Sequence, residues 1–539
     1  MLAIDIPTAI RKGQIIVKVQ DASLEWAIKH VMRFGDTDVF PLPFEYGAIQ
    51  EDWGDIKTFL KRQEIDTWGV REYRRMLTPK HRLGFRIATQ LDPLDTLLIC
   101  ALVYEVGEEF ESVRIPADQN IVHSYRFLPT ADGLLYDSAV NFGTFRKQSI
   151  DLATEPSTSF VLMTDIADFF PRLYSHVVEN AMISATKSPD HARVITKLIN
   201  AWNMGVSYGI PVGPSPFRLI AELAINDIDS ALLAENIRFC RYSDDYRIFA
   251  PNERSAREAL AFLANTLFQS HGLTLQGSKT ELIPADQFVD RFGRAERDQE
   301  RYGLQKDYIS LLKKLNLFNK YDPTSYDDLD DEARDAVDSL NLWELLRQEA
   351  TSNRHLDVAL VSFVLGRIRE LGLKDEDNLL LRYLDRLSPA FREVVETLIS
   401  QSHLSESDTA ALGKKLIDLF QHDAVGYLDY HREWLIHAFT KDAAWGQTDQ
   451  LIKLYQQHFD SPTQRAITLA LGRAGSWHWI KPRKHGVFDL SPWNRRAFLY
   501  AASCLPGDES GHWFRFLGPR LDILERAVIK YAKKSPITS

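Results

Sequence analysis

The middle of the chain alternates short apolar runs of strand type with segments of helical period. A continuous apolar run at 160–163 predicts a buried strand that ends close to Asp165. The segment 238–250 consists of two β-rich apolar stretches around a short polar break that contains Asp244 and Asp245. This pattern predicts a strand-turn-strand hairpin with an acidic tip.

From about residue 336 onward, the apolar positions follow a helical period. Two faces show this period: Leu356, Leu360, Phe363, Val364, Ile368 and Leu371 form one, and Phe391, Val394, Val395, Leu398 and Ile399 form the other. Successive amphipathic helices with short polar breaks predict an all-α, helical-repeat-like C-terminal domain, although the sequence has no fixed period.

A chain of 539 residues is too long for a single core. We expect an N-terminal region at 1–150, an α/β domain at 151–300 and the helical domain at 336–539. The segment 301–335 reads as a solvated acidic linker, because seven acids and one base lie within 322–335 together with a proline.

The composition excludes several classes of protein. A net charge of -10 argues against a bulk polyelectrolyte binder, so a nucleic-acid surface must be local, as at 61–86, where eight Lys or Arg face three acids. The three cysteines lack Cys-x-x-Cys spacing, which excludes a disulfide framework or a zinc ribbon and predicts a reducing cytoplasm. The sequence has no leader of charged then apolar residues and no apolar run of about 18 residues, so we expect neither secretion nor a membrane span.

Asp244 and Asp245 suggest metal chemistry only when Asp165 is considered with them. By itself, an Asp pair in a turn is typical of a solvated hairpin. Two neighbouring carboxylates near a sheet are costly unless a cation compensates them. With Asp165 at the end of an adjacent strand, the three carboxylates can hold two divalent ions about 3.5–4 Å apart, which is the arrangement of phosphoryl transfer. Mg²⁺ prefers such oxygen ligands.

Two further segments add to this picture. The Gly and Pro cluster at 208–215 lets the backbone approach a base pair closely before a helix begins near Ser215. On that helix, Arg218 and Glu222 lie one turn apart, either as part of a nucleic-acid surface or as an exposed helix pair. Lys279 can meet a leaving phosphate or lie on the surface.

The segments appear in the order of the palm motifs of reverse transcriptases, and the chain resembles that family over about 70–285. The motifs are Asp165-Ile-Ala-Asp-Phe-Phe170, Gly209-Ile-Pro-Val-Gly-Pro214, Tyr242-Ser-Asp-Asp245 and Gly272-Leu-Thr-Leu-Gln-Gly-Ser-Lys-Thr280. The resemblance implies an α/β palm-and-fingers polymerase of the right-hand reverse transcriptase fold, followed by the helical domain. It also implies a nucleotidyltransferase that adds dNTPs to a primer hydroxyl.

The resemblance assigns roles to individual residues. Asp165, Asp244 and Asp245 become the catalytic, metal-binding triad for two Mg²⁺ ions, or Mn²⁺, with a backbone carbonyl from Ile166. Phe170 falls where the family keeps an aromatic gate that favours deoxynucleotides. The remaining nucleotide contacts are expected from Val212, Gly213, Lys279 and the fingers residues Lys80, Arg82 and Arg86. Asp168 reads as a turn residue.

Val212 departs from the usual pattern, because reverse transcriptases of retroviruses and group II introns have Gln there. The run from Val212 to Glu222 instead resembles the bacterial abortive-infection and defence-associated reverse transcriptases, the so-called unknown groups, which also have a helical C-terminal half. That resemblance implies antiphage defence, DNA or RNA as a partner, assembly into homo-oligomers, and synthesis that is template-independent and protein-primed. Whether a template is copied stays open.

Two alternatives remain from the sequence. The palm can be a catalytic relic beside a helical scaffold that binds nucleic acid or a phage protein, or the chain can be a retron-type enzyme that copies a dedicated RNA. The C-terminal half also interleaves aromatic and basic residues, as single-strand binders do. Its candidate contacts are Trp477, Trp479, Arg483 and Lys484, and the competing interpretation is an interhelical loop packed by its tryptophans.

Overall fold

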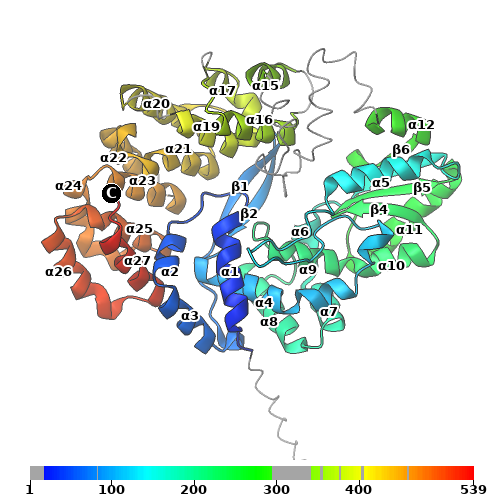
Figure 1. Ribbon diagram of the computed structural model, residues 1–539, viewed down its shortest axis with the longest axis horizontal. Coiled ribbons are helices and arrows are strands. Elements are labelled where there is room, and N and C mark those ends of the chain that lie inside the picture. Colours follow the sequence, from blue (N-terminus) through cyan, green and yellow to red (C-terminus); the bar gives the residue numbers. More distant parts are fainter. Residues whose placement is uncertain are drawn as a thin grey trace, which may run out of the picture.

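The computed structural model describes residues 17–538 except 82, 294–340, 353–355, 376–377, 402–405 and 458–459. The predicted linker at 301–335 therefore lies outside the described residues, as does Arg82. In Figure 1 a β-containing part lies on one side, the helical C-terminal half lies on the other, and N-terminal elements lie between them. The mixed α/β architecture with a helical C-terminal half confirms the coarse prediction of fold class.

The N-terminal region combines helices with a two-stranded antiparallel hairpin. Its elements are α1 (Asp21–Phe34), α2 (Glu45–Glu51), α3 (Trp53–Arg62), β1 (Arg74–His81), β2 (Gly84–Gln90) and α4 (Pro93–Ser112). Helix α4 begins after Asp92, whose side chain accepts a hydrogen bond from the Leu94 N–H, with proline at the first helical position. Most of α4 is buried, so this helix forms the centre of the N-terminal core.

A four-stranded antiparallel sheet in the order β4-β5-β3-β6 forms the β-containing part. Its strands are β3 (Phe160–Asp165), β4 (Arg238–Tyr242), β5 (Asp245–Ala250) and β6 (Glu281–Pro284). Strand β3 and the β4–β5 hairpin confirm the sequence predictions. The helices around the sheet are α5 (Phe142–Thr154), α6 (Phe169–Arg172), α7 (Ser175–Ala185), α8 (Pro189–Trp202), α9 (Pro216–Ala224), α10 (Asn226–Ala234), α11 (Glu253–His271) and α12 (Ala285–Phe288).

Both faces of this sheet are covered, because alternate side chains of each strand enter different cores. Leu162 and Ile248 pack in the core that contains α9 and α11. Val161 and Phe249 pack in a smaller core with α5 and α12. This burial on both faces explains why the strands read as nearly continuous apolar runs.

The described residues of the C-terminal half form helices joined by turns and loops, with no strand among them. Its elements include α15 (Leu342–Thr351), α16 (Val358–Glu370), α19 (Phe391–Ser400), α20 (Glu406–Asp418), α21 (Asp429–Lys441), α22 (Thr448–Gln457), α23 (Ser461–Arg473), α24 (Trp477–Ile480), α25 (Pro492–Ala501), α26 (Gly507–Leu517) and α27 (Ile523–Lys534). Val364 and Val394, on the two predicted apolar faces, are fully buried in α16 and α19. No helix among the described residues is both long and apolar enough to cross a membrane.

The helical half and the N-terminal region share hydrophobic cores. Phe40 and Met76 pack in the core of the C-terminal helices, whereas Leu524 and Ala527 of α27 pack in the core that holds α1 and α4. Helix α27 also lies against α2. The boundary predicted from sequence is therefore crossed by continuous packing, which places the helical half beside the β1–β2 hairpin (Figure 1).

Buried ion pairs reinforce this junction. The Glu45 carboxylate, fully buried on α2, accepts hydrogen bonds from Arg465 at 2.6 Å and Arg496 at 2.9 Å. Arg496 also faces Asp92 at 3.0 Å, and neither side chain is exposed. Burial by itself would raise the pKa of Glu45, but the two guanidinium groups hold it below its ordinary value. Removing Arg496 would leave the buried Glu45 and Asp92 carboxylates with one cation fewer between them.

Candidate active site at the β4–β5 hairpin

The structure brings the three predicted aspartates together at one end of the sheet. Asp165, the last residue of β3, lies directly opposite Asp245, the first residue of β5. Asp244 lies in the two-residue turn between β4 and β5, and its carbonyl accepts a 3.0 Å hydrogen bond from the Ile166 N–H. The backbone register thus places residues eighty positions apart at the same site. Metal binding by the aspartates and by the Ile166 carbonyl stays a prediction.

Burial and mutual repulsion make the charged form of these carboxylates unfavourable. Burial, together with the nearby charges of Asp165 and Asp245, raises the pKa of Asp244 to about 7. Burial likewise raises the pKa of Asp245, with Asp165 adding to the shift and Arg247 opposing it. Such a cluster favours the approach of a cation.

Lys279 supplies one positive charge to the cluster. Its Nζ donates to Asp165 Oδ2 at 2.5 Å, and the chain just before it is held by a 2.7 Å bond from the Gln276 N–H to the Asp165 carbonyl. Burial lowers the pKa of Lys279, but the hydrogen bond to Asp165 and the three carboxylates raise it overall. Lys279, predicted either to contact a phosphate or to lie on the surface, thus lies at the carboxylate cluster and pairs with Asp165.

The side chains as they stand do not form a finished metal site. Across the described residues, no three His, Cys, Asp or Glu side chains are arranged to hold a metal ion. The donor set still fits divalent magnesium, because it consists of three carboxylates whose charge Lys279 compensates only in part. Binding would require the carboxylates to rotate and the Lys279 ammonium to leave Asp165.

A buried network holds the turn that carries Asp244. Ser243 has a positive φ of 54°, and its N–H donates to Ser124 Oγ at 2.8 Å while its carbonyl accepts from Arg241 at 3.1 Å. Ser124 and Arg241 both hydrogen-bond the Glu222 carboxylate, at 2.7 and 2.8 Å. Arg241 also forms a bidentate pair with Asp229. Glu222 thus anchors both contacts that clamp the turn.

The sequence interpretation of Glu222 as a member of an exposed helix pair is wrong. Glu222 is only 1% exposed, because it faces the sheet and also pairs with Arg114 at 2.8 Å. Arg218 instead lies 3.3 Å from Asp38. The missed signal was Arg241, since a charged residue inside an apolar strand needs a buried carboxylate partner.

Replacing Ser124 with Ala should destabilise the protein by about 1–3 kcal/mol, because the Ser243 N–H and one Glu222 oxygen would lose a buried partner. Differential scanning calorimetry would show this as a lower melting temperature. The matched control is Ser230→Ala on α10, since that exposed hydroxyl bonds only to the Asn226 carbonyl of its own helix. Equal shifts for the two variants would show that the clamp contributes nothing.

The loop 209–214 joins the site to the N-terminal hairpin. The Ile210 N–H donates to the Phe170 carbonyl at 2.9 Å, and the Val212 carbonyl accepts from the Thr89 N–H on β2 at 2.7 Å. Gly213 is required here, because an added Cβ would lie 2.2 Å from the Thr89 carbonyl oxygen. Backbone hydrogen bonds therefore connect the predicted nucleotide contacts: Phe170, which follows β3, is joined to the loop 209–214, and that loop, with Val212 and Gly213, is joined to β2.

The basic residues of the hairpin point to different places. Lys80 is exposed at the end of β1, and its charge lowers the pKa of Asp245, opposing the effect of burial. Arg86 is partly buried, and its charge acts on Tyr430 of α21 in the helical half. The charge of Lys80 thus acts on the aspartate cluster, whereas the charge of Arg86 acts on the C-terminal helices.

The C-terminal candidates also separate. Trp479 is 4% exposed and Arg483 stacks over its ring at 4.1 Å, so packing explains this pair. Trp477 is 48% exposed and lines a groove together with Lys484. Figure 1 shows this region at the opposite side of the molecule from β4 and β5.

Comparison with known proteins finds similarity at the level of solved structures. No protein-family model and no curated protein matches the chain. Among solved structures, a telomerase from Candida albicans, in complex with the TWJ fragment of telomeric RNA, is similar with a TM-score of 0.29 and 12% identity. The alignment covers 79% of this chain and 71% of that one.

Proposed function

We propose that the chain is a DNA polymerase of the reverse transcriptase type, with a palm formed by the four-stranded sheet and fingers that include the β1–β2 hairpin. The observation that carries the proposal is the convergence of Asp165, Asp244 and Asp245 at one end of the sheet. These carboxylates are largely withdrawn from water and repel one another. Their arrangement suits the binding of two Mg²⁺ ions.

Each part of the site has a defined task in this proposal. Bound Mg²⁺ would activate the primer hydroxyl and neutralise the triphosphate, and the three aspartates would hold it. Lys279, released from Asp165, would then face the phosphates, and Lys80 would approach them from β1. Phe170 lies beside the loop 209–214, where its ring would exclude a ribose 2′-hydroxyl and so favour dNTPs.

The biological setting rests on the motif resemblance. We place the enzyme in antiphage defence, because the run from Val212 to Glu222 and the helical C-terminal half resemble defence-associated reverse transcriptases. Template-independent, protein-primed synthesis and homo-oligomeric assembly belong to the same proposal.

Incorporation of single nucleotides tests the activity and the use of a template together. Purified protein is incubated with Mg²⁺ and each labelled dNTP, with and without RNA, and the product is sequenced and digested with protease. We expect DNA synthesis in at least one arm. Homopolymer growth without RNA supports untemplated synthesis, RNA-dependent growth supports copying, and a mobility change after protease shows covalent attachment.

Metal binding can be measured without any substrate. Mg²⁺ or Mn²⁺ should raise the melting temperature of the protein, by an amount that corresponds to about 2.7 kcal/mol at a hundred times the dissociation constant. Asp244→Asn should abolish this dependence and raise the melting temperature without metal, because it removes one of three repelling charges. A metal response that survives in Asp244→Asn would contradict the assignment.

The second candidate function is a scaffold built on a relic palm, and the contact between Lys279 and Asp165 favours it. A permanent ion pair there would occupy one of the three carboxylates without metal. Cells expressing wild-type protein or Asp165→Asn are challenged with phage. A scaffold keeps protecting after this substitution, whereas a polymerase loses protection.

A further inference from the structure

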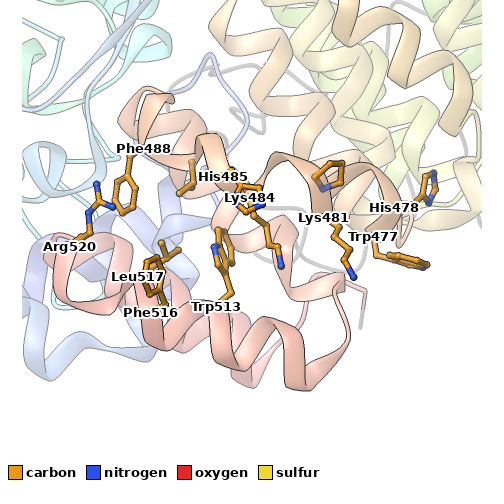
Figure 2. Close-up of a pocket in the computed structure, with 12 residues that line it drawn as sticks. Trp477, His478, Lys481, Lys484, His485, Phe488, Trp513, Phe516, Leu517 and Arg520 are labelled. Carbon is orange, nitrogen blue, oxygen red and sulfur yellow. The ribbon is translucent and has the colours of Figure 1, made fainter.

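A groove of about 800 Å³ runs between the segment that follows α24 and helix α26. Figure 2 shows its side chains in a row, with Arg520 and Phe488 at one end and Trp477 at the other. Residues 481–489 that form one wall are a short helical segment held against α24 and α25. The volume is in the range of ligand sites, about 300–1,000 Å³.

Large aromatic surfaces are exposed along this groove. Phe516 is 73% exposed and Trp477 is 48% exposed, although both are side chains that a helical domain could bury. Trp513 lies between them, with the Lys484 ammonium 6.0 Å from its ring. Flat rings left open to solvent offer stacking surfaces to another flat group.

The charge of the groove has one sign. Its lining includes Lys481, Lys484 and Arg520 together with two histidines, and it contains no carboxylate. Glu509 lies just outside the lining and is shared by Lys481 and Lys484, so one carboxylate faces two ammonium groups. Arg520 stacks on Phe488 at 3.7 Å, and the described residues provide it with no ion pair. The surplus positive charge suits a phosphate-bearing ligand.

We propose that this groove binds single-stranded nucleic acid, with bases stacked on Trp477 and Phe516 and the backbone phosphates against Lys481 and Arg520. A row of aromatic rings with cations between them is the arrangement that binds a single strand without sequence preference. A free nucleotide would use one ring and one cation, whereas this row extends over several of each. A peptide with positively charged groups would need a carboxylate partner in the groove, and the lining has none.

The groove is separate from the proposed polymerase site. Helices α24 and α26, which flank it, lie at the outer edge of the helical half, across the molecule from the β4–β5 hairpin (Figure 1). A strand bound here would be held away from the aspartates, as a product or a recognised foreign strand. Binding needs neither metal nor dNTP, so it can be tested independently of incorporation.

Photo-crosslinking localises the bound strand. Full-length Asp244→Ala protein in EDTA is titrated with a 15-nucleotide single strand containing 5-iododeoxyuridine, irradiated, digested, and the crosslink assigned to a residue by fragment mass spectra. We expect a crosslink at Trp477 that saturates with oligonucleotide concentration. The concentration at half-saturation is then compared between variants that retain Trp477.

Phe516→Ala should raise this half-saturation concentration about tenfold, because one stacking surface is lost. Lys481→Gln should weaken binding and reduce the slope of log affinity against log salt by about 0.7, as expected for one lost phosphate contact. The controls are Phe268→Ala, an exposed aromatic on α11, and Lys187→Gln, an exposed lysine after α7, and neither should change the curve.

Competition experiments separate the occupants. An unlabelled single strand should displace the probe, and a duplex of the same sequence should not, because its bases are already stacked. Displacement by dAMP at the same concentration as the strand would overturn the proposal in favour of a nucleotide pocket. Absence of a Trp477 crosslink, or curves unchanged by Phe516→Ala and Lys481→Gln, would also overturn it.

Discussion

Replacing Asp244 with Ala should abolish nucleotide incorporation, lowering the rate by at least about 10²–10³-fold, as expected when a group that stabilises the transition-state charge is removed. Asp244 lies in the turn between β4 and β5, beside Asp165 and Asp245. Without its carboxylate, the cluster would lose a proposed metal ligand that the other two residues do not replace. Incorporation of labelled dNTPs by purified protein measures the effect.

Asp168 provides the matched control for this experiment. It is exposed, lies three residues after Asp165 and has a positive φ of 48°, a conformation that Asn tolerates well. Asp168→Asn should therefore fold normally and retain incorporation. If Asp244→Ala protein with a melting temperature no lower than that of the wild type still extended DNA, the polymerase assignment would be wrong.

Replacing Arg496 with Met should lower the free energy of unfolding by about 3–5 kcal/mol, because Glu45 and Asp92 would remain buried without their shared cation. Met has a similar length and keeps the contact with the Trp493 ring, over which the guanidinium lies at 4.7 Å. The effect should be concentrated at the junction between the helical half and the N-terminal region. Thermal unfolding followed by tryptophan fluorescence would report it.

An exposed ion pair across the same junction serves as the comparison. Lys530 on α27 contacts Asp52 at 2.7 Å, but its side chain is half exposed. Water and salt screen this pair, so Lys530→Met should shift the melting temperature far less than Arg496→Met. Similar shifts for the two variants would contradict the view that buried charges hold the two halves together.

The local pattern along the chain was sufficient for several parts of the candidate site. The apolar run that ends in Asp165 and the polar break at Asp244 predicted β3 and the β4–β5 hairpin, because an apolar run and the pairing of two strands joined by a short turn depend on residues close in sequence. Amphipathic periods likewise located α16 and α19. Motif order then suggested that distant segments belong to one site.

The partners of buried charges could not be read in the same way. Glu222 looked like an exposed helix residue until the sheet was in place, and its partner Arg114 lies more than a hundred residues away. The contact of Glu45 with Arg496 spans a still longer separation. Such pairs form only when packing excludes water from both residues. The residues next to each partner in the sequence therefore do not indicate which distant residue it will meet.

The sequence by itself determined which segments become strands and helices, and it supplied the three aspartates and their order. The tertiary structure decided that α27 packs into the N-terminal core, that Lys279 reaches Asp165, and that Trp479 is buried while Trp477 lines an open groove. The physical reason is the range of the interactions. Backbone hydrogen bonds and hydrophobic periods act over a few residues, whereas burial and charge pairing depend on how the whole chain packs.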